Sequence, residues 1–171
     1  MCQSFNSKLR TIAVLVGMLL FLCPNMKADN SPWSFRLSID PLHTTFTHNS
    51  GCLGMSFEPR YSLLNELHMG FGVGILETYR FNTAPRVPVF IGFHGDDYSS
   101  DVSSTYDLET GFMISTGNGT RTSYFINPQW GFRAFNVGFA VGYVGGLPLD
   151  SKGAKRWYNG LNIRLSYIFG K

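Results

Sequence analysis

The 171-residue chain carries 14 Lys and Arg against 11 Asp and Glu, so charged residues make up only 15% of it. Typical soluble domains contain about 25% charged residues, and this composition therefore argues against an ordinary water-exposed surface. Aromatic residues also account for 15%, and there are 19 Gly. An excess of aromatic and small residues over charged ones favours a protein whose outer surface meets lipid.

The beginning of the chain has the organisation of a secretory signal peptide. Lys8 and Arg10 precede an unbroken apolar run at 12–22, which is the order of a basic segment and a short apolar segment before a cleavage site. The run is shorter than the about 20 residues that a membrane-spanning helix needs. We therefore expect 1–28 to be removed after export, leaving a mature domain at 29–171.

Cleavage would also change the charge balance. It removes Lys8, Arg10 and Lys27, so 14 basic residues become 11 against 11 acidic ones. A neutral mature chain offers no basic surface for nucleic acid. Cys52 would be the only remaining thiol, which excludes a disulfide framework. None of the four His falls in a metal-ligand spacing, and we expect no metal and no cofactor.

Beyond the signal peptide the dominant sequence period is two, which is typical of β-strands. Segments rich in Gly, Pro, Asn, Asp and Ser separate the alternating runs, and the junction at 133–136 is the least clearly marked. In chain order, the runs lie at 33–40, 53–61, 68–75, 86–93, 106–114, 124–131, 137–143 and 161–169. They predict an all-β fold, an eight-stranded antiparallel up-and-down barrel.

Alternation alone fits two barrels that are inside out relative to each other. A soluble lipocalin-like barrel keeps its apolar face inside, whereas a transmembrane barrel turns that face to lipid. The less apolar faces of the third and seventh runs carry no charge, and consist of Gly70, Gly72, Gly74, Gly138, Ala140 and Gly142. Such faces suit a lumen better than water. We expect a transmembrane β-barrel with a closed polar lumen, because eight strands enclose too little space for an open pore.

The large residues predicted to face this lumen carry both charges, so they can pair with one another away from lipid. They are Arg36, Asp40, Glu58, Arg60, Asp107, Glu109 and Arg164. His68 and His94 share the same phase near strand ends, where we expect them to make hydrogen bonds. Aromatic residues near the strand ends resemble the girdles of membrane barrels.

The last run resembles the C-terminal strand signal of outer-membrane barrels, with Ile163, Leu165, Tyr167 and Phe169 alternating. That resemblance implies recognition by the barrel-insertion machinery, although two residues follow the last aromatic. The segments 86–90, 106–112 and 137–143 are similar to the small outer-membrane β-barrel proteins of Bacteroides-type bacteria, the PorT-like class. The resemblance covers nearly all of 29–171. It implies an outer-membrane location in a Gram-negative cell and specifies architecture rather than activity.

The sequence favours a non-enzymatic role, either structural or in surface interactions. Of the loops expected on one side, the last carries Lys152, Lys155 and Arg156, which are candidates to bind lipopolysaccharide phosphates. Two alternatives remain. A lipid-modifying enzyme such as a lipid A deacylase would need a nucleophile and a base, for example Ser50 with His48, or His43 with Asp40. A soluble lipocalin-like protein would instead bind an apolar ligand.

Overall fold

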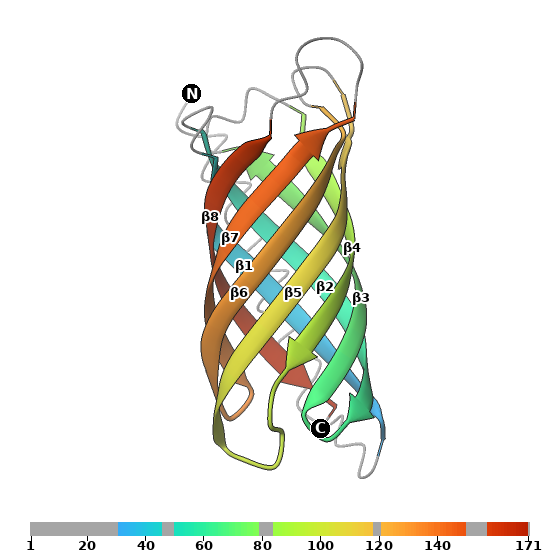
Figure 1. Cartoon of the computed structure of the whole chain (residues 1–171), viewed down its shortest axis with the longest axis vertical. Coiled ribbons are helices and arrows are strands. Elements are labelled where there is room, and N and C mark those ends of the chain that lie inside the picture. Colours follow the sequence, from blue (N-terminus) through green and yellow to red (C-terminus); the bar gives the residue numbers. More distant parts are fainter. Residues whose placement is uncertain (1–30, 46–49, 79–83, 118–120, 150–156, 171) are drawn as a thin grey trace, which may run out of the picture.

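The computed structural model describes residues 31–45, 50–78, 84–117, 121–149 and 157–170. Within them, eight strands form a closed antiparallel barrel in chain order (Figure 1). The strands are β1 (Trp33–Thr45), β2 (Ser50–Leu64), β3 (Leu67–Thr78), β4 (Arg86–Gly95), β5 (Val102–Ser115), β6 (Ser123–Ala134), β7 (Val137–Pro148) and β8 (Tyr158–Phe169). The predicted eight-stranded up-and-down barrel is confirmed, and the pairing of β1 with β8 closes it.

The two ends of the barrel differ in how the strands connect. At the turn end, the lower end in Figure 1, β1 begins, β8 ends and two connections span only 65–66 and 135–136. The loop end carries the connections after β1, β3, β5 and β7, parts of which lie outside the described residues. Lys152, Lys155 and Arg156 and the predicted signal peptide at 1–28 also lie outside them. The part of the chain that the structure describes contains no helix long and apolar enough to cross a membrane.

Side chains alternate between the lumen and the outer surface, and the charged phase is the inner one. Arg36 is 2% exposed and Glu58 is 0% exposed, whereas Phe71 is 56% and Trp130 is 64% exposed. Twenty-eight large apolar or aromatic side chains of the described residues are exposed, and every one of the eight strands contributes to them. The barrel is therefore polar inside and apolar outside, the opposite of a soluble barrel.

A bulge in β1 changes which residues face the lumen. The pairing of β1 with β2 shifts register between Asp40 and His43, and its pairing with β8 shifts between Ile39 and Leu42. Pro41 lies in the bulge and has no N–H to donate to a neighbouring strand. Two residues instead of one separate Asp40 from His43, and both side chains are buried. Strict alternation would have turned one of them outward.

Small residues in the wall make room for large ones across the lumen. A Cβ at Gly70 would lie 2.2 Å from Oε1 of Glu58, and one at Gly72 would lie 2.2 Å from Cζ of Phe90. Only a residue without a Cβ fits at these two positions, because the side chains of Glu58 and Phe90 already occupy the lumen space beside their Cα atoms. The uncharged faces predicted for β3 and β7 thus serve as the wall against which longer side chains pack.

The lumen is divided along its length into two parts. Toward the turn end it is filled by charged and amide side chains, which agrees with the predicted polar lumen. Near the loop end it is crossed by an apolar layer, which the alternating pattern did not predict. The members of this apolar layer are Cys52, Leu76, Phe90, Met113, Phe125, Val144 and Tyr158, and none is more than 8% exposed.

Candidate functional site

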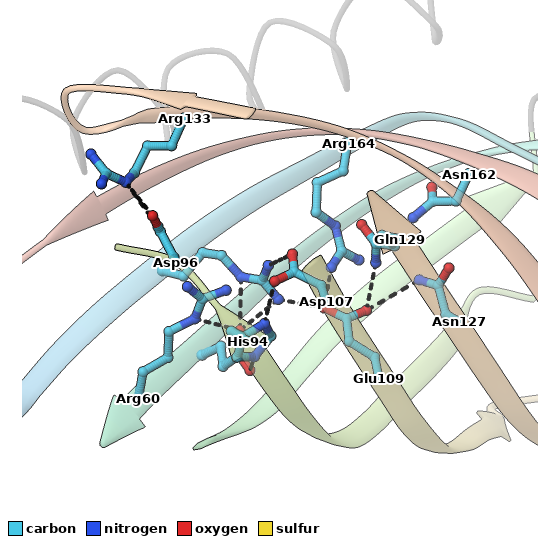
Figure 2. Close-up of polar contacts among 12 residues, drawn as sticks. Arg60, His94, Asp96, Asp107, Glu109, Asn127, Gln129, Arg133, Asn162 and Arg164 are labelled. Carbon is cyan, nitrogen blue, oxygen red and sulfur yellow. Dashed lines mark hydrogen bonds and ion pairs between the residues drawn. The ribbon is translucent and has the colours of Figure 1, made fainter. Parts of the chain in front are cut away.

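The structure places all seven predicted lumen residues inside the barrel and joins them in one network of ion pairs. Arg60, Asp107, Glu109 and Arg164 are labelled in Figure 2. They come from four strands: β1 (Arg36, Asp40), β2 (Glu58, Arg60), β5 (Asp107, Glu109) and β8 (Arg164). We call this set, together with His94, the ionic network. The strand register brings these residues within reach of one another, because each lies on the inner phase of its strand.

Arg36 is at the centre of the ionic network. Its Nε donates to Glu58 at 2.7 Å and its Nη1 donates to Asp107 at 2.8 Å. Its Nη2 donates to Glu109. A guanidinium has five N–H donors in a fixed fork, and here three carboxylates from two strands surround it. Arg36 therefore links β1 to β2 on one side and to β5 across the lumen.

Arg164 and Glu109 form the second half of the network. Arg164 binds Asp40 in a bidentate manner, with Nε–Oδ1 at 2.6 Å and Nη2–Oδ2 at 2.9 Å. Its Nη1 also donates to Glu109. Glu109 accepts two further hydrogen bonds, from the amide groups of Asn127 at 3.2 Å and Gln129 at 3.1 Å. Glu109 thus receives four donors from β1, β6 and β8.

His94 bridges two carboxylates. Its Nε2 lies 2.6 Å from Oε1 of Glu58, and its Nδ1 lies 2.7 Å from Oδ1 of Asp107. An ionised carboxylate only accepts hydrogen bonds, so both ring nitrogens must donate. This geometry is that of an imidazolium. With His94 charged, the four cations of the ionic network (Arg36, Arg60, Arg164 and His94) match its four anions (Asp40, Glu58, Asp107 and Glu109).

A further ion pair, absent from the predicted lumen residues, lies at the turn end. Nε of Arg133 lies 2.9 and 2.8 Å from the two carboxylate oxygens of Asp96. The same guanidinium donates to the backbone carbonyl oxygens of Phe135, Asp97 and Ser100. It therefore ties the β4–β5 connection to the β6–β7 turn. Extending the alternation of the 124–131 run by two residues would have placed Arg133 in the lumen.

The β4–β5 connection also has an internal structure. The hydroxyl groups of Ser99 and Ser100 donate to Asp97 at 2.6 and 2.9 Å. These hydrogen bonds, that from Ser99 first, lower the pKa of Asp97 below its ordinary value. In this segment Asp96 therefore forms an ion pair and Asp97 stabilises a turn. Among the described residues, no group of three or more His, Cys, Asp or Glu is placed to hold a metal ion.

The residues considered for catalysis are placed as follows. His43 and Asp40 both lie in the lumen, where they are 3% and 7% exposed, and Asp40 is bound to Arg164. The cavity that they line has room for only a water molecule or two. His48 and the side chain of Ser50 lie outside the described part of the chain. The geometry thus brings the first pair together in a closed interior rather than at a surface that a lipid substrate reaches.

No protein-family model matches this chain, and no curated protein and no solved structure is significantly similar to it. The resemblance to PorT-like barrels therefore stays a prediction.

Proposed function

We propose that this chain is an outer-membrane β-barrel protein with a structural or surface-interaction role. The observation that carries the proposal is the reversal of ordinary burial. Charged side chains such as Arg36, Glu58 and Glu109 fill the interior, and large apolar side chains cover the outside. A soluble monomer rarely exposes an apolar patch larger than a few hundred Å², whereas a lipid-embedded barrel requires such a surface.

The backbone satisfies the same requirement. A bilayer core offers no water to hydrogen-bond with exposed N–H and C=O groups, so a sheet can cross it only as a closed barrel. Here every strand pairs with two neighbours. Within the described residues, no strand edge along the barrel wall is left open.

Aromatic residues with polar atoms lie toward both ends of the outer surface. At the turn end, the rings of Trp33 and Tyr61 meet edge to face at 5.1 Å. At the loop end, Nε1 of Trp157 donates to the hydroxyl of Tyr143, which donates to Asn159. Side chains with an apolar body and a polar tip favour the boundary between lipid and water. Their positions support a barrel that spans the membrane along its length.

The interior argues against the alternative of a soluble lipocalin-like binder. Such a protein needs an apolar chamber for its ligand. In the described lumen, the ionic network occupies one part and the packed apolar layer occupies the other. The cavity between them has room for a water molecule or two and is too small for a lipid.

The loop end is the side on which we expect contacts with other molecules. Lys152, Lys155 and Arg156 belong to its last connection, and three cations in one loop suit the phosphate groups of lipopolysaccharide. Replacing all three by Gln should weaken binding of lipopolysaccharide to the folded protein and leave insertion intact. Unchanged binding would refute this assignment of the loop.

Fractionation of cells that express the full chain tests the membrane proposal directly. We expect the protein in the outer-membrane fraction, extracted only by detergent, with an unboiled gel band that migrates faster than the boiled one. Antibody detection of a tag placed in the 150–156 connection on intact cells would then establish the orientation. A protein recovered from the soluble periplasm without detergent would contradict the proposal.

A further inference from the structure

The lumen contains buried polar atoms that have no hydrogen-bond partner among the described residues, and their distribution is one-sided. They are Oγ of Ser34 and Ser38, Nε2 of His43, Oδ1 of Asn127 and Asn162, and Oε1 of Gln129. Ser34 and Ser38 lie in the first half of β1, nearer the turn end. The three amide residues follow Phe125 and Tyr158 along β6 and β8, which run toward the turn end. Five of the atoms therefore lie on the turn-end side of the apolar layer. The sixth, Nε2 of His43, lies at the boundary of the layer, because His43 pairs with Cys52 in the sheet.

The orientation of the amide groups follows from their charged neighbours. Asn127 and Gln129 donate their NH₂ groups to Glu109, and Asn162 donates its NH₂ group to Asp40 at 3.5 Å. Turning any of these amides over would place its oxygen against a carboxylate. The carbonyl oxygens must therefore face away from the anions, where each needs a donor that the neighbouring side chains do not supply. An unsatisfied buried acceptor costs about 1–3 kcal/mol.

A cavity lies where such a donor is needed. It lies between the ionic network and the apolar layer, with Asp40, His43 and Asn127 on its polar side and Phe90 and Phe125 on its apolar side. Its volume suits a water molecule or two, and its polar lining supplies the 2–4 partners that a buried water requires. Nε2 of His43 and Oδ1 of Asn127 are the two unpartnered atoms among the residues that line it.

A second cavity lies on the other side of Arg164, toward the turn end. Its lining includes Arg36, Arg60 and Arg133 together with Gly138 and Ala140 of β7. It has room for about one water molecule. Arg164, a member of the ionic network, lines both cavities.

The described side chains of the apolar layer offer water no unpartnered polar atom to bind. The rings of Phe90 and Phe125 meet edge to face at 6.3 Å, and the hydroxyl of Tyr158 is already paired with Ser123 at 3.0 Å. Among the described side chains of this layer, no buried polar atom lacks a partner. A narrow apolar constriction excludes water, and through it protons and ions.

We infer that the cavity beside His43 and Asn127 is a water-binding site, the inner end of a lumen hydrated from the turn end only, and that the apolar layer is the barrier to passage. The inference rests on the proposed function for its membrane setting. It assigns separate tasks to the two parts of the interior. The ionic network holds the strands together and stays wet, and the apolar layer seals the barrel.

Nuclear magnetic resonance of the full-length protein folded in detergent micelles tests the water site. We expect cross-relaxation between water and the side-chain amide of Asn127, which lines the cavity, and none between water and the methyl groups of Val144, which belongs to the apolar layer and lines neither cavity. Absence of the contact at Asn127, or an equal contact at Val144, would overturn the inference. Because micelles suffice, this measurement does not depend on the protein's location in the cell.

Proton flux into vesicles tests the barrier. Purified barrels are inserted into phosphatidylcholine vesicles that contain a pH-sensitive dye, and insertion is checked by gel migration without boiling. The double substitution Phe90→Ala with Phe125→Ala should raise proton entry by at least about tenfold over the original protein, because it removes the two rings that narrow the lumen. The control Phe112→Ala removes a ring of the same size from the outer surface, where Phe112 is 48% exposed, and should leave the flux unchanged.

The outcomes of the flux experiment separate the two proposals. An inserted double variant that is no leakier than the Phe112→Ala control would overturn the barrier assignment, as would an original protein that already conducts protons. A chain that does not enter vesicles at all would contradict the proposed function, and the water contacts measured in micelles would then still decide the water site. If the double variant does not fold, Phe125→Leu provides a milder opening of the same layer, with the same two results to distinguish.

Discussion

Replacing Glu109 by Gln tests whether the ionic network stabilises the barrel. The substitution preserves the shape of the side chain and removes one negative charge. Glu109 accepts hydrogen bonds from Arg36 and Arg164 and from two amide groups. An amide has one acceptor oxygen, and its NH₂ group would point at donors. The change therefore leaves two buried guanidinium groups facing one carboxylate fewer.

The expected magnitude follows from what remains around the two arginines. Breaking a buried ion pair by removing one partner costs about 3–5 kcal/mol. Arg36 keeps Glu58 and Asp107, and Arg164 keeps its bidentate contact with Asp40. These carboxylates compensate in part, so we expect a loss near the lower end, about 3 kcal/mol. With a urea dependence of about 1–3 kcal/mol per M, the unfolding midpoint should fall by roughly 1–3 M.

Equilibrium unfolding in urea of the barrel folded in lipid vesicles provides the assay, followed by tryptophan fluorescence and by gel migration without boiling. The matched control is Glu66→Gln, the same chemical change at an exposed position in the turn between β2 and β3, for which we expect less than about 0.5 kcal/mol. A loss at Glu109 no larger than that of the control would refute the reasoning. The double variant with His94→Gln, which also removes a cation, should lose less than the sum of the two single losses.

Three further predictions follow from particular positions. Gly72→Ala should destabilise the barrel by about 1–3 kcal/mol, because the added Cβ would meet the ring of Phe90. The control Gly95→Ala should change the stability little, because a Cβ there would lie 3.7 Å from its nearest neighbouring atom. Urea unfolding of the two variants measures both effects. Phe135→Gly should raise the free energy of unfolding by roughly 0.5–1 kcal/mol. The backbone φ of Phe135 is 54°, and this left-handed conformation disfavours a bulky residue. A lower unfolding midpoint in urea would contradict this prediction. Leu108 lies in the middle of β5 and is 41% exposed on the outer surface. Leu108→Arg should lower the free energy of unfolding in vesicles by about 2–4 kcal/mol, because it places a charge near the bilayer midplane. A negligible loss would show that this surface does not face lipid.

The number of strands and the two faces of the barrel could be predicted because both are local properties. A strand turns successive side chains to opposite sides, so a run such as 106–114 already assigns its charged residues to one face and its apolar residues to the other. The lumen positions of Asp107, Glu109 and Arg164 followed from that rule. The uncharged faces of β3 and β7 then indicated which side is the lumen.

Two local features could not be predicted from the sequence pattern, one in a strand and one in a turn. The bulge at Pro41 adds a residue to β1, so Asp40 and His43 both face inward, although strict alternation separates them. The second feature is the β6–β7 turn, where Phe135 occupies a left-handed backbone position that Gly usually takes. Its conformation is held by the tertiary contacts of Phe135, whose N–H donates to Asp101 and whose carbonyl accepts from Arg133.

The amino-acid sequence by itself determined how many strands form, which residues point inward and that charge belongs inside, because these depend on neighbours along the chain. Only the tertiary structure decided that Arg36 meets three carboxylates, that His94 bridges two of them and that Phe90 and Phe125 close the lumen. These contacts join residues 13 to 73 positions apart. They depend on the register and tilt with which the strands close, and no local sequence pattern encodes the height at which distant side chains meet.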